Sequence, residues 1–202
     1  GCVLAAANGD YPVYYPKEGW AEQNPEEWWS AVCGAVRQVI EEASVAPEEI
    51  AGVGIDGQSW SAIAIDRNGH VLTNTPIWMD TRAQSICDRL NEEIGAEAIF
   101  EVAGNSLQPS YTTAKILWYK ENLPEVYAKI DKILQSNSFI AFKLTGAVSQ
   151  DLSQGYGLHC FDMRTGKWNE AMCEKLGIPV EFLPEIVPCD HVVGTVTKKA
   201  AE

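Results

Sequence analysis

The sequence predicts an α/β domain in which a mixed β-sheet is covered by helices on both faces. Short β-prone runs come first, at residues 3–7 and 11–15, and the turn-forming Asn8-Gly9-Asp10 separates them. From residue 82 onward, helical and strand-like segments alternate. Because an early antiparallel hairpin precedes this alternation, a mixed sheet is favoured over a purely parallel one.

The first helix is predicted over residues 24–44. Asn24 suits the N-cap position and Pro25 the first helical position, while Glu26 and Glu27 complement the positive end of the helix dipole. Apolar side chains then recur at helical spacing on one face: Trp28, Val32, Val36, Val39 and Ile40. This face is expected to pack on the sheet.

A strand, a corner and a hairpin are predicted next. Residues 50–56 form a short apolar run after a Pro-Glu-Glu turn, and residues 61–66 form a second one. Asn68-Gly69 supplies the positive φ that a tight turn needs before Val71-Leu72. The polar segment Gly57 to Ser61 therefore lies at a corner between two strands.

The remainder of the chain is predicted to be mainly helical. Gly177 and Pro179 mark the end of the last of these helices. The helices are expected at residues 82–94, 96–104, 113–123, 124–130, 137–146 and 169–177, and the strands at residues 132–135 and 156–163.

Composition narrows the functional class. The formal net charge is −13, which would repel phosphate backbones and argues against nucleic acid as a partner. The chain has no apolar run of about 18 residues and no signal-peptide pattern, so a soluble cytoplasmic protein without membrane partners is expected. It starts at Gly1 without an initiator Met and ends in what reads as a helix cut short, so it is interpreted as a fragment.

The corner at Gly57 to Ser61 has the chemistry of a carbohydrate site. A strand that stops at Gly57 delivers the following residues to the end of the sheet, where ligands bind in α/β folds. Gly57, which has no side chain, is expected to let the backbone come close to a ligand there. Gln58 offers amide donors and an acceptor, Ser59 and Ser61 offer hydroxyls, and Trp60 offers a flat apolar face. The alternative, equally open on residue types alone, is a buried turn in which Trp60 belongs to the core.

A second segment, residues 76–84, has two readings as well. Asp80 and Arg82 follow Trp78 and Met79 at the point where a strand gives way to a helix. Asp80 could cap the helix and pair with Arg82, and this structural reading has the stronger local support. In the functional reading, the carboxylate faces a sugar.

Taken together, these segments resemble the amino-terminal domain of the FGGY carbohydrate kinases, and most closely its xylulokinase-like members. The resemblance runs nearly from end to end. Its specificity comes from the order of the matching segments, which lie at residues 11–29, 54–66, 76–83, 110–134, 144–157 and 166–187.

The resemblance implies an RNase H-like, actin-like ATPase fold. It also implies transfer of the γ-phosphoryl group of ATP, with Mg²⁺, to a hydroxyl of a ketose or polyol. Ser59 and Trp60 occupy the two positions at which family members hold the sugar after the glutamine, here Gln58. Ser110 lies where glycerol-phosphorylating relatives place a substrate-contacting tyrosine. The family's W-x-D-x-R-like segment beside the pocket corresponds to Asp80 and Arg82.

The chain also departs from the family pattern. Xylulokinases typically carry Met-His where this chain has Ser59-Trp60, so D-xylulose is the first substrate hypothesis while glycerol, gluconate, ribulose, erythritol and fuculose stay open. The first strand pair with its D-x-G-T phosphate loop is expected to precede residue 1. The nucleotide-binding lobe, which carries the catalytic base, is expected to follow residue 202.

Residues 1–202 are thus expected to form the sugar-side lobe, inactive alone, with no catalytic or metal-binding residue of its own. A homodimer of the full-length protein is left open. Two rival functions are weighed against the kinase. One is a metal-dependent nuclease built on four aspartates, and the other is a non-catalytic sugar-binding module. The nuclease lacks the basic stripe that such a site needs. Its carboxylates would be Asp56, Asp66, Asp80 and Asp151.

Overall fold

The computed structural model describes residues 1–202 and alternates helices with short strands. Its helices are α1 (Pro25–Ala43), α2 (Gln84–Leu90), α3 (Ala96–Ala103), α4 (Thr112–Asn122), α5 (Pro124–Tyr127), α6 (Ser136–Thr145), α7 (Leu152–Gly155), α8 (Glu170–Leu176) and α9 (Lys198–Ala201). Its strands are β1 (Glu22–Gln23), β2 (Ile63–Ile65), β3 (Thr75–Pro76), β4 (Lys132–Leu134), β5 (Ser149–Asp151), β6 (Phe161–Asp162), β7 (Lys167–Trp168) and β8 (Glu185–Val187).

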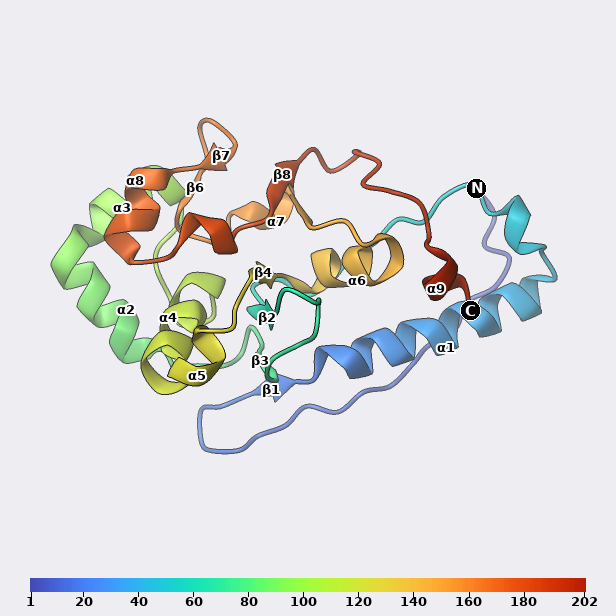
Figure 1. Cartoon of the computed structure of the whole chain (residues 1–202), viewed down its shortest axis with the longest axis horizontal. Coiled ribbons are helices and arrows are strands. Elements are labelled where there is room, and N and C mark those ends of the chain that lie inside the picture. The colour runs from blue at the N-terminus through green and yellow to red at the C-terminus, as the bar shows by residue number, and fades with distance from the viewer.

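The helices divide into two groups along the long axis of the molecule. Figure 1 shows α2, α3, α4, α5 and α8 gathered at one end, whereas α1, α6, α9 and both chain termini lie toward the other. The strands lie between the groups or at their edges. None of the helices has the length and apolar character that crossing a membrane requires.

The strands pair in both directions, which confirms the α/β class with mixed pairing. β1 pairs with β3, β2 with β4 and β6 with β7, all antiparallel, whereas β5 and β8 are parallel. The pairs form four separate two-stranded ladders, not one continuous sheet. The predicted single sheet is therefore replaced by short ladders that helices and loops connect.

Three of the predicted strands are not formed. Residues 3–7, 11–15 and 50–56 belong to no strand, and Tyr14 makes only an isolated bridge to Glu22. A strand requires a partner for its backbone N–H and C=O groups, and these segments run extended without one. Their apolar side chains are accordingly uncovered: 82% of Val3 and 60% of Val53 is exposed.

The strand predicted over residues 156–163 is also largely wrong, because only Phe161–Asp162 is a strand. Consecutive tight turns precede it: Leu158 N–H donates to Gly155 O at 3.0 Å, and Phe161 N–H donates to Leu158 O at 2.8 Å. Two turns in succession bend the backbone, so the extended conformation of a strand does not continue over all of residues 156–163.

The predicted helices are confirmed, and α1 forms as its end signals indicate. The Asn24 side chain accepts from Glu26 N–H at 3.0 Å, Pro25 opens the helix, and Ser44 ends it in the left-handed conformation with φ of 51°. Trp28 is buried, but Val36 on the same face remains 49% exposed. The C-terminal half of α1 therefore extends beyond the core that covers its start.

Strand β2 divides the core in two. Side chains alternate along a strand, so Ala62 and Ala64 enter the larger apolar cluster, while Ile63 and Ile65 enter the smaller one. The larger cluster draws on α2, α3, α4 and α8, and the smaller on β4, α6 and the start of α1. The polar corner that leads into β2 is thus fixed by both cores at once.

Candidate functional site

The predicted corner, residues 57–61, lies immediately before β2 and is held from three sides. Ser136 Oγ, on the first residue of α6, donates to Gln58 O at 2.6 Å. Gln58 Nε2 donates to Gln23 Oε1 at 2.7 Å, and Thr112 Oγ1 donates to Ser61 O at 3.1 Å. The corner therefore joins β1, α4 and α6.

Gly57 was expected to let the backbone approach a ligand, but its close neighbour is α6. A Cβ atom built on Gly57 would lie 2.4 Å from Ser136 Oγ and 3.0 Å from Asn137 N. Glycine is thus required here because the corner packs against the start of α6. The approach is between two parts of the same chain.

Trp60 has an unusual backbone that is bonded on both sides. Its φ is +69°, a left-handed conformation that costs a non-glycine residue roughly 1–2 kcal/mol. Its N–H donates to Gln135 Oε1 at 3.0 Å, and its C=O accepts from Lys115 Nζ at 2.7 Å. These two bonds hold the backbone in a conformation that it would not adopt alone.

The indole of Trp60 belongs to a group of aromatic rings. It stacks on Tyr111 with ring centroids 4.4 Å apart and meets Tyr156 edge-on at 6.1 Å. Tyr111 also contacts the buried ring of His159, with ring centroids 5.1 Å apart. Trp60 is half-buried as a residue, and its indole Nε1 is buried without a hydrogen-bond partner.

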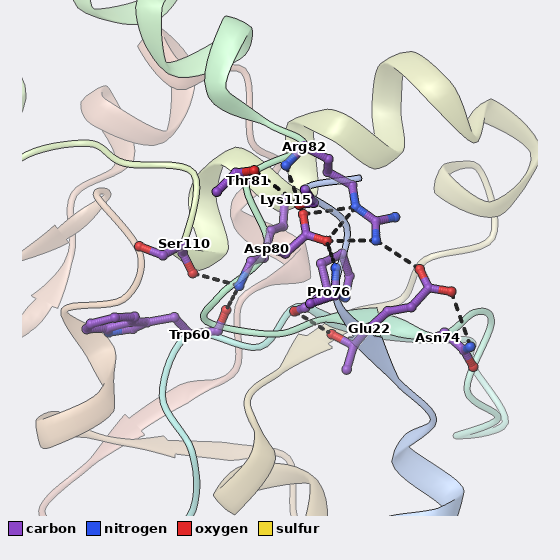
Figure 2. A network of polar contacts seen from close by, with 12 residues as sticks. Glu22, Trp60, Asn74, Pro76, Asp80, Thr81, Arg82, Ser110 and Lys115 are labelled. Atoms are coloured by element: carbon purple, nitrogen blue, oxygen red, sulfur yellow. Dashed lines mark hydrogen bonds and ion pairs between the residues drawn. The ribbon is translucent and has the colours of Figure 1, made fainter. Parts of the chain in front are cut away.

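Lys115 on α4 is fully buried and binds only backbone oxygens. Its Nζ donates to Trp60 O at 2.7 Å and to Ser110 O at 2.6 Å (Figure 2). Burial lowers the pKa of Lys115 to about 7, because removal from water penalises the charged form. The amine is consequently poised to lose its charge near neutral pH.

Asp80 and Arg82 form a buried ion pair next to this corner. The Asp80 carboxylate accepts from Arg82 Nε and from its Nη2, at 2.9 Å and 2.8 Å. It also accepts from Ala21 N–H at 2.7 Å, and Arg82 Nη2 reaches Glu22 at 2.9 Å (Figure 2). The predicted pairing of Asp80 with Arg82 is confirmed, but the predicted capping is wrong, because helix α2 begins two residues after Arg82 and its N-cap is Ala83.

The Arg82 guanidinium also lies against two indoles. Its Cζ lies 3.8 Å from the Trp20 ring centroid and 4.9 Å from that of Trp118. A cavity of about 390 Å³ opens beside these groups, lined by Trp20, Glu22, Asn74, Arg82 and Trp118 among others. The polar groups of Asp80 and Arg82 are hydrogen-bonded within the chain. A contact of either residue with a sugar therefore stays a prediction.

The predicted site residues lie around one part of the fold. Figure 2 shows Trp60 and Ser110 on one side of Lys115, and Asp80 with Arg82 on the other. Gln58, Ser59, Trp60 and Ser110 do not line the cavity beside Arg82, nor the neighbouring cavity between Tyr15 and Met79. The sugar-binding role of these four residues therefore also stays a prediction.

The nuclease reading loses its structural basis. No group of three or more His, Cys, Asp or Glu side chains in the chain could hold a metal ion. Asp66 bonds to His70, Asp80 to Arg82, and Asp151 to Asn137 and Ser153. Three of the four aspartates are thus engaged at separate places, and no cluster of metal-ligating side chains gathers them.

Sequence reasoning missed the residues that support the corner, namely Lys115, Gln135, Tyr111 and Tyr156. Each contacts Trp60 or its backbone. One signal was readable for Lys115: it is the lone charged residue in the otherwise uncharged run from Ser106 to Tyr119. A lysine inside such a run must either reach solvent or find acceptors.

Comparison with known proteins finds sugar and polyol kinases among the relatives of the chain. The family model of the FGGY carbohydrate kinases, N-terminal domain, matches residues 1–202. The xylulose kinase of Bacillus subtilis is 28% identical over 201 residues, which cover 100% of the chain and 40% of that protein. A glycerol kinase of Thermococcus gammatolerans is 29% identical, over 98% of the chain and 41% of its own length.

A solved structure gives the same result in three dimensions. The xylulose kinase of Rhodospirillum rubrum superposes with a TM-score of 0.90 at 26% identity, covering 98% of this chain and 41% of that one. The chain thus spans about 40% of the length of the curated relatives it matches. The fold of the 202 residues is that of the corresponding part of these kinases.

Proposed function

Because the chain belongs to the FGGY family of carbohydrate kinases, we propose that it forms the sugar-side part of an ATP-dependent kinase for a ketose or polyol. The first substrate to test is D-xylulose, since xylulose kinases are among the relatives in sequence and in structure. Glycerol is the second, since a glycerol kinase is 29% identical over nearly the same residues.

The single observation that carries this proposal is the fixed indole of the half-buried Trp60. Its backbone is bonded on both sides and its ring is stacked on Tyr111, so the indole presents a rigid apolar face. Sugars bind to such a face through their C–H groups. The hydroxyls of Ser59 and Ser110 form no hydrogen bond within the chain and both residues are half-buried, which leaves these hydroxyls for a ligand.

In this proposal the chain contributes positioning to the reaction. Phosphoryl transfer depends on alignment of the acceptor hydroxyl, neutralisation of the triphosphate and a base that accepts the hydroxyl proton. ATP with a divalent metal supplies the phosphoryl group and the neutralisation. The chain offers no cluster of three or more metal-ligating side chains. The roles left for this chain are to hold the sugar, through Gln58, Ser59, Trp60 and Ser110, and to orient its hydroxyl.

A sugar panel tests the proposal. The complete product of the gene that encodes these residues is purified, and ADP release is followed by a coupled assay with ATP and Mg²⁺. The panel consists of D-xylulose, D-ribulose, L-fuculose, erythritol, gluconate and glycerol. We expect one of them, with D-xylulose first, to raise ADP release far above the rate without sugar.

Two results would contradict the proposal. If no sugar or polyol raises ADP release while isothermal titration shows that one binds, the protein is a non-catalytic sugar-binding module. If none binds at all, the sugar-side assignment fails as well. A titration with the 202-residue chain alone shows whether binding needs more than these residues.

A further inference from the structure

Lys115 joins two segments that are distant in sequence. Its ammonium group bonds to the carbonyl of Trp60, in the corner before β2, and to the carbonyl of Ser110, in the loop before α4. The first carbonyl belongs to Trp60, and the second directly precedes Tyr111. The rings of Trp60 and Tyr111 stack on each other. Figure 2 shows both bonds of the buried amine, which thus fix the backbone at Trp60 and directly before Tyr111.

The position of Lys115 is poorly suited to stability alone. The side chain is fully buried, and it forms no ion pair with any carboxylate. Both oxygens of the neighbouring Asp80 already accept from Arg82 or Ala21. Taking an ammonium group out of water costs several kcal/mol, and an apolar side chain of similar length would avoid this cost.

The Lys115 amine instead fixes the backbone conformation of Trp60. Trp60 is held at φ of +69°, and of its two backbone hydrogen bonds one comes from Lys115. In the other, Trp60 N–H donates to Gln135 Oε1, and Gln135 Nε2 in turn donates to Gln154 O at 2.6 Å. Strained backbone conformations persist where surrounding bonds over-determine them, and they concentrate at binding sites.

We propose that Lys115 is a positioning residue: by bonding the Trp60 and Ser110 carbonyls, it sets the orientation of the Trp60 indole that receives the sugar. Lys115 touches no substrate in this mechanism and acts only through Trp60 and Tyr111. The orientation of the indole can be tested without any activity. The effect on sugar affinity rests on the proposed function.

The first arm of the test observes the indole directly. The 202-residue chain is labelled with 5-fluorotryptophan, so that its seven tryptophans give separate fluorine NMR signals. The signal that disappears in Trp60→Phe is assigned to Trp60. In Lys115→Met we expect this signal to shift or broaden while the signals of Trp28 and Trp168 stay in place. In Lys120→Met, an exposed lysine of the same helix, no signal of Trp60 should move.

The second arm measures kinetics in the complete gene product. Lys115→Met should raise KM for the sugar about ten-fold and leave KM for ATP unchanged. In the Trp60→Ala background, the same substitution should change KM for the sugar less than about two-fold, because the group through which Lys115 acts is absent. A merely structural role of Lys115 would give additive effects.

The outcomes separate the two proposals. A parent protein without kinase activity defeats the proposed function, while the fluorine signal of Trp60 still decides on Lys115. An unmoved Trp60 signal in a folded Lys115→Met, or additive kinetic effects, overturns the positioning role. If Lys115→Met does not fold, Lys115→Gln, which keeps an N–H₂ donor, takes its place under the same criteria. Loss of folding in both assigns Lys115 to the core and overturns the proposal.

Discussion

The guanidinium of Arg82 lies 3.8 Å from the ring centroid of Trp20 and forms a buried ion pair with Asp80. Only 3% of the Arg82 side chain is exposed. Arg82 therefore links the segment around β1, through Glu22, to helix α4, through Trp118. The pair is a structural element of the domain, whatever it does with a ligand.

Removal of Arg82 should destabilise the fold strongly. Arg82→Met leaves the Asp80 carboxylate buried without its cation, so we expect the free energy of unfolding to fall by about 3–5 kcal/mol. Urea titration of the 202-residue chain measures the change. The matched control is Arg89→Met, whose exposed ion pair with Glu121 is worth less than about 1 kcal/mol. Equal losses in the two variants would contradict the structural role.

Trp60 should determine affinity for the sugar. In the complete gene product, we expect Trp60→Ala to raise KM for the sugar about ten-fold or more, in line with roughly 1–3 kcal/mol of lost stacking and burial. The control is Trp29→Ala, which removes a half-buried tryptophan on α1 and should leave this KM unchanged. An unchanged KM together with a lower melting temperature in Trp60→Ala would instead place the indole in the core.

Gly157 should tolerate no larger residue, since a Cβ atom there would lie 2.9 Å from Trp60 Cδ1 and 3.1 Å from Gln135 Nε2. Gly157→Ala is expected to lower the free energy of unfolding by about 1–3 kcal/mol through overpacking. Gly34→Ala, on the exposed face of α1 with no atom within 4 Å, should raise it by about 0.5–1 kcal/mol. Thermal unfolding of both variants checks the opposite signs.

His159 should make the fold sensitive to acid. Its ring is buried, and this burial lowers the pKa of His159 to about 4, whereas the unfolded chain retains the ordinary value near 6.5. Between these values the unfolded chain binds the proton and the folded chain does not, so the free energy of unfolding falls as pH decreases from 6.5 to 4. The expected contribution over this window is on the order of 3 kcal/mol.

Denaturant titrations at several pH values measure this dependence. His159→Gln should flatten the fall between pH 6.5 and pH 4, because the variant has no group at this position that takes up a proton. The exposed His70 provides the control, and His70→Gln should leave most of the fall in place. A His159→Gln variant with the parental pH dependence would show that other groups are responsible.

The order of segments along the chain determined the family, the α/β class and most helices. Asn24 and Pro25 began α1 as predicted, and the pairing of Asp80 with Arg82 needed only two residues of separation. Such features depend on local geometry, in which capping groups and near neighbours reach each other whatever the rest of the fold does. The strands at residues 3–7, 11–15 and 50–56 failed because strand formation depends on a partner that a local pattern does not reveal.

Only the tertiary structure decided how the corner at Trp60 is held. Lys115 and Gln135 lie 55 and 75 residues away in sequence, yet both bond to the Trp60 backbone. The sequence also predicts that Gly57 leaves room for a ligand, but in the structure α6 occupies that space. Residue types can suggest that a tryptophan meets a sugar, but its backbone angle and the rings stacked on it follow from contacts that folding alone brings together.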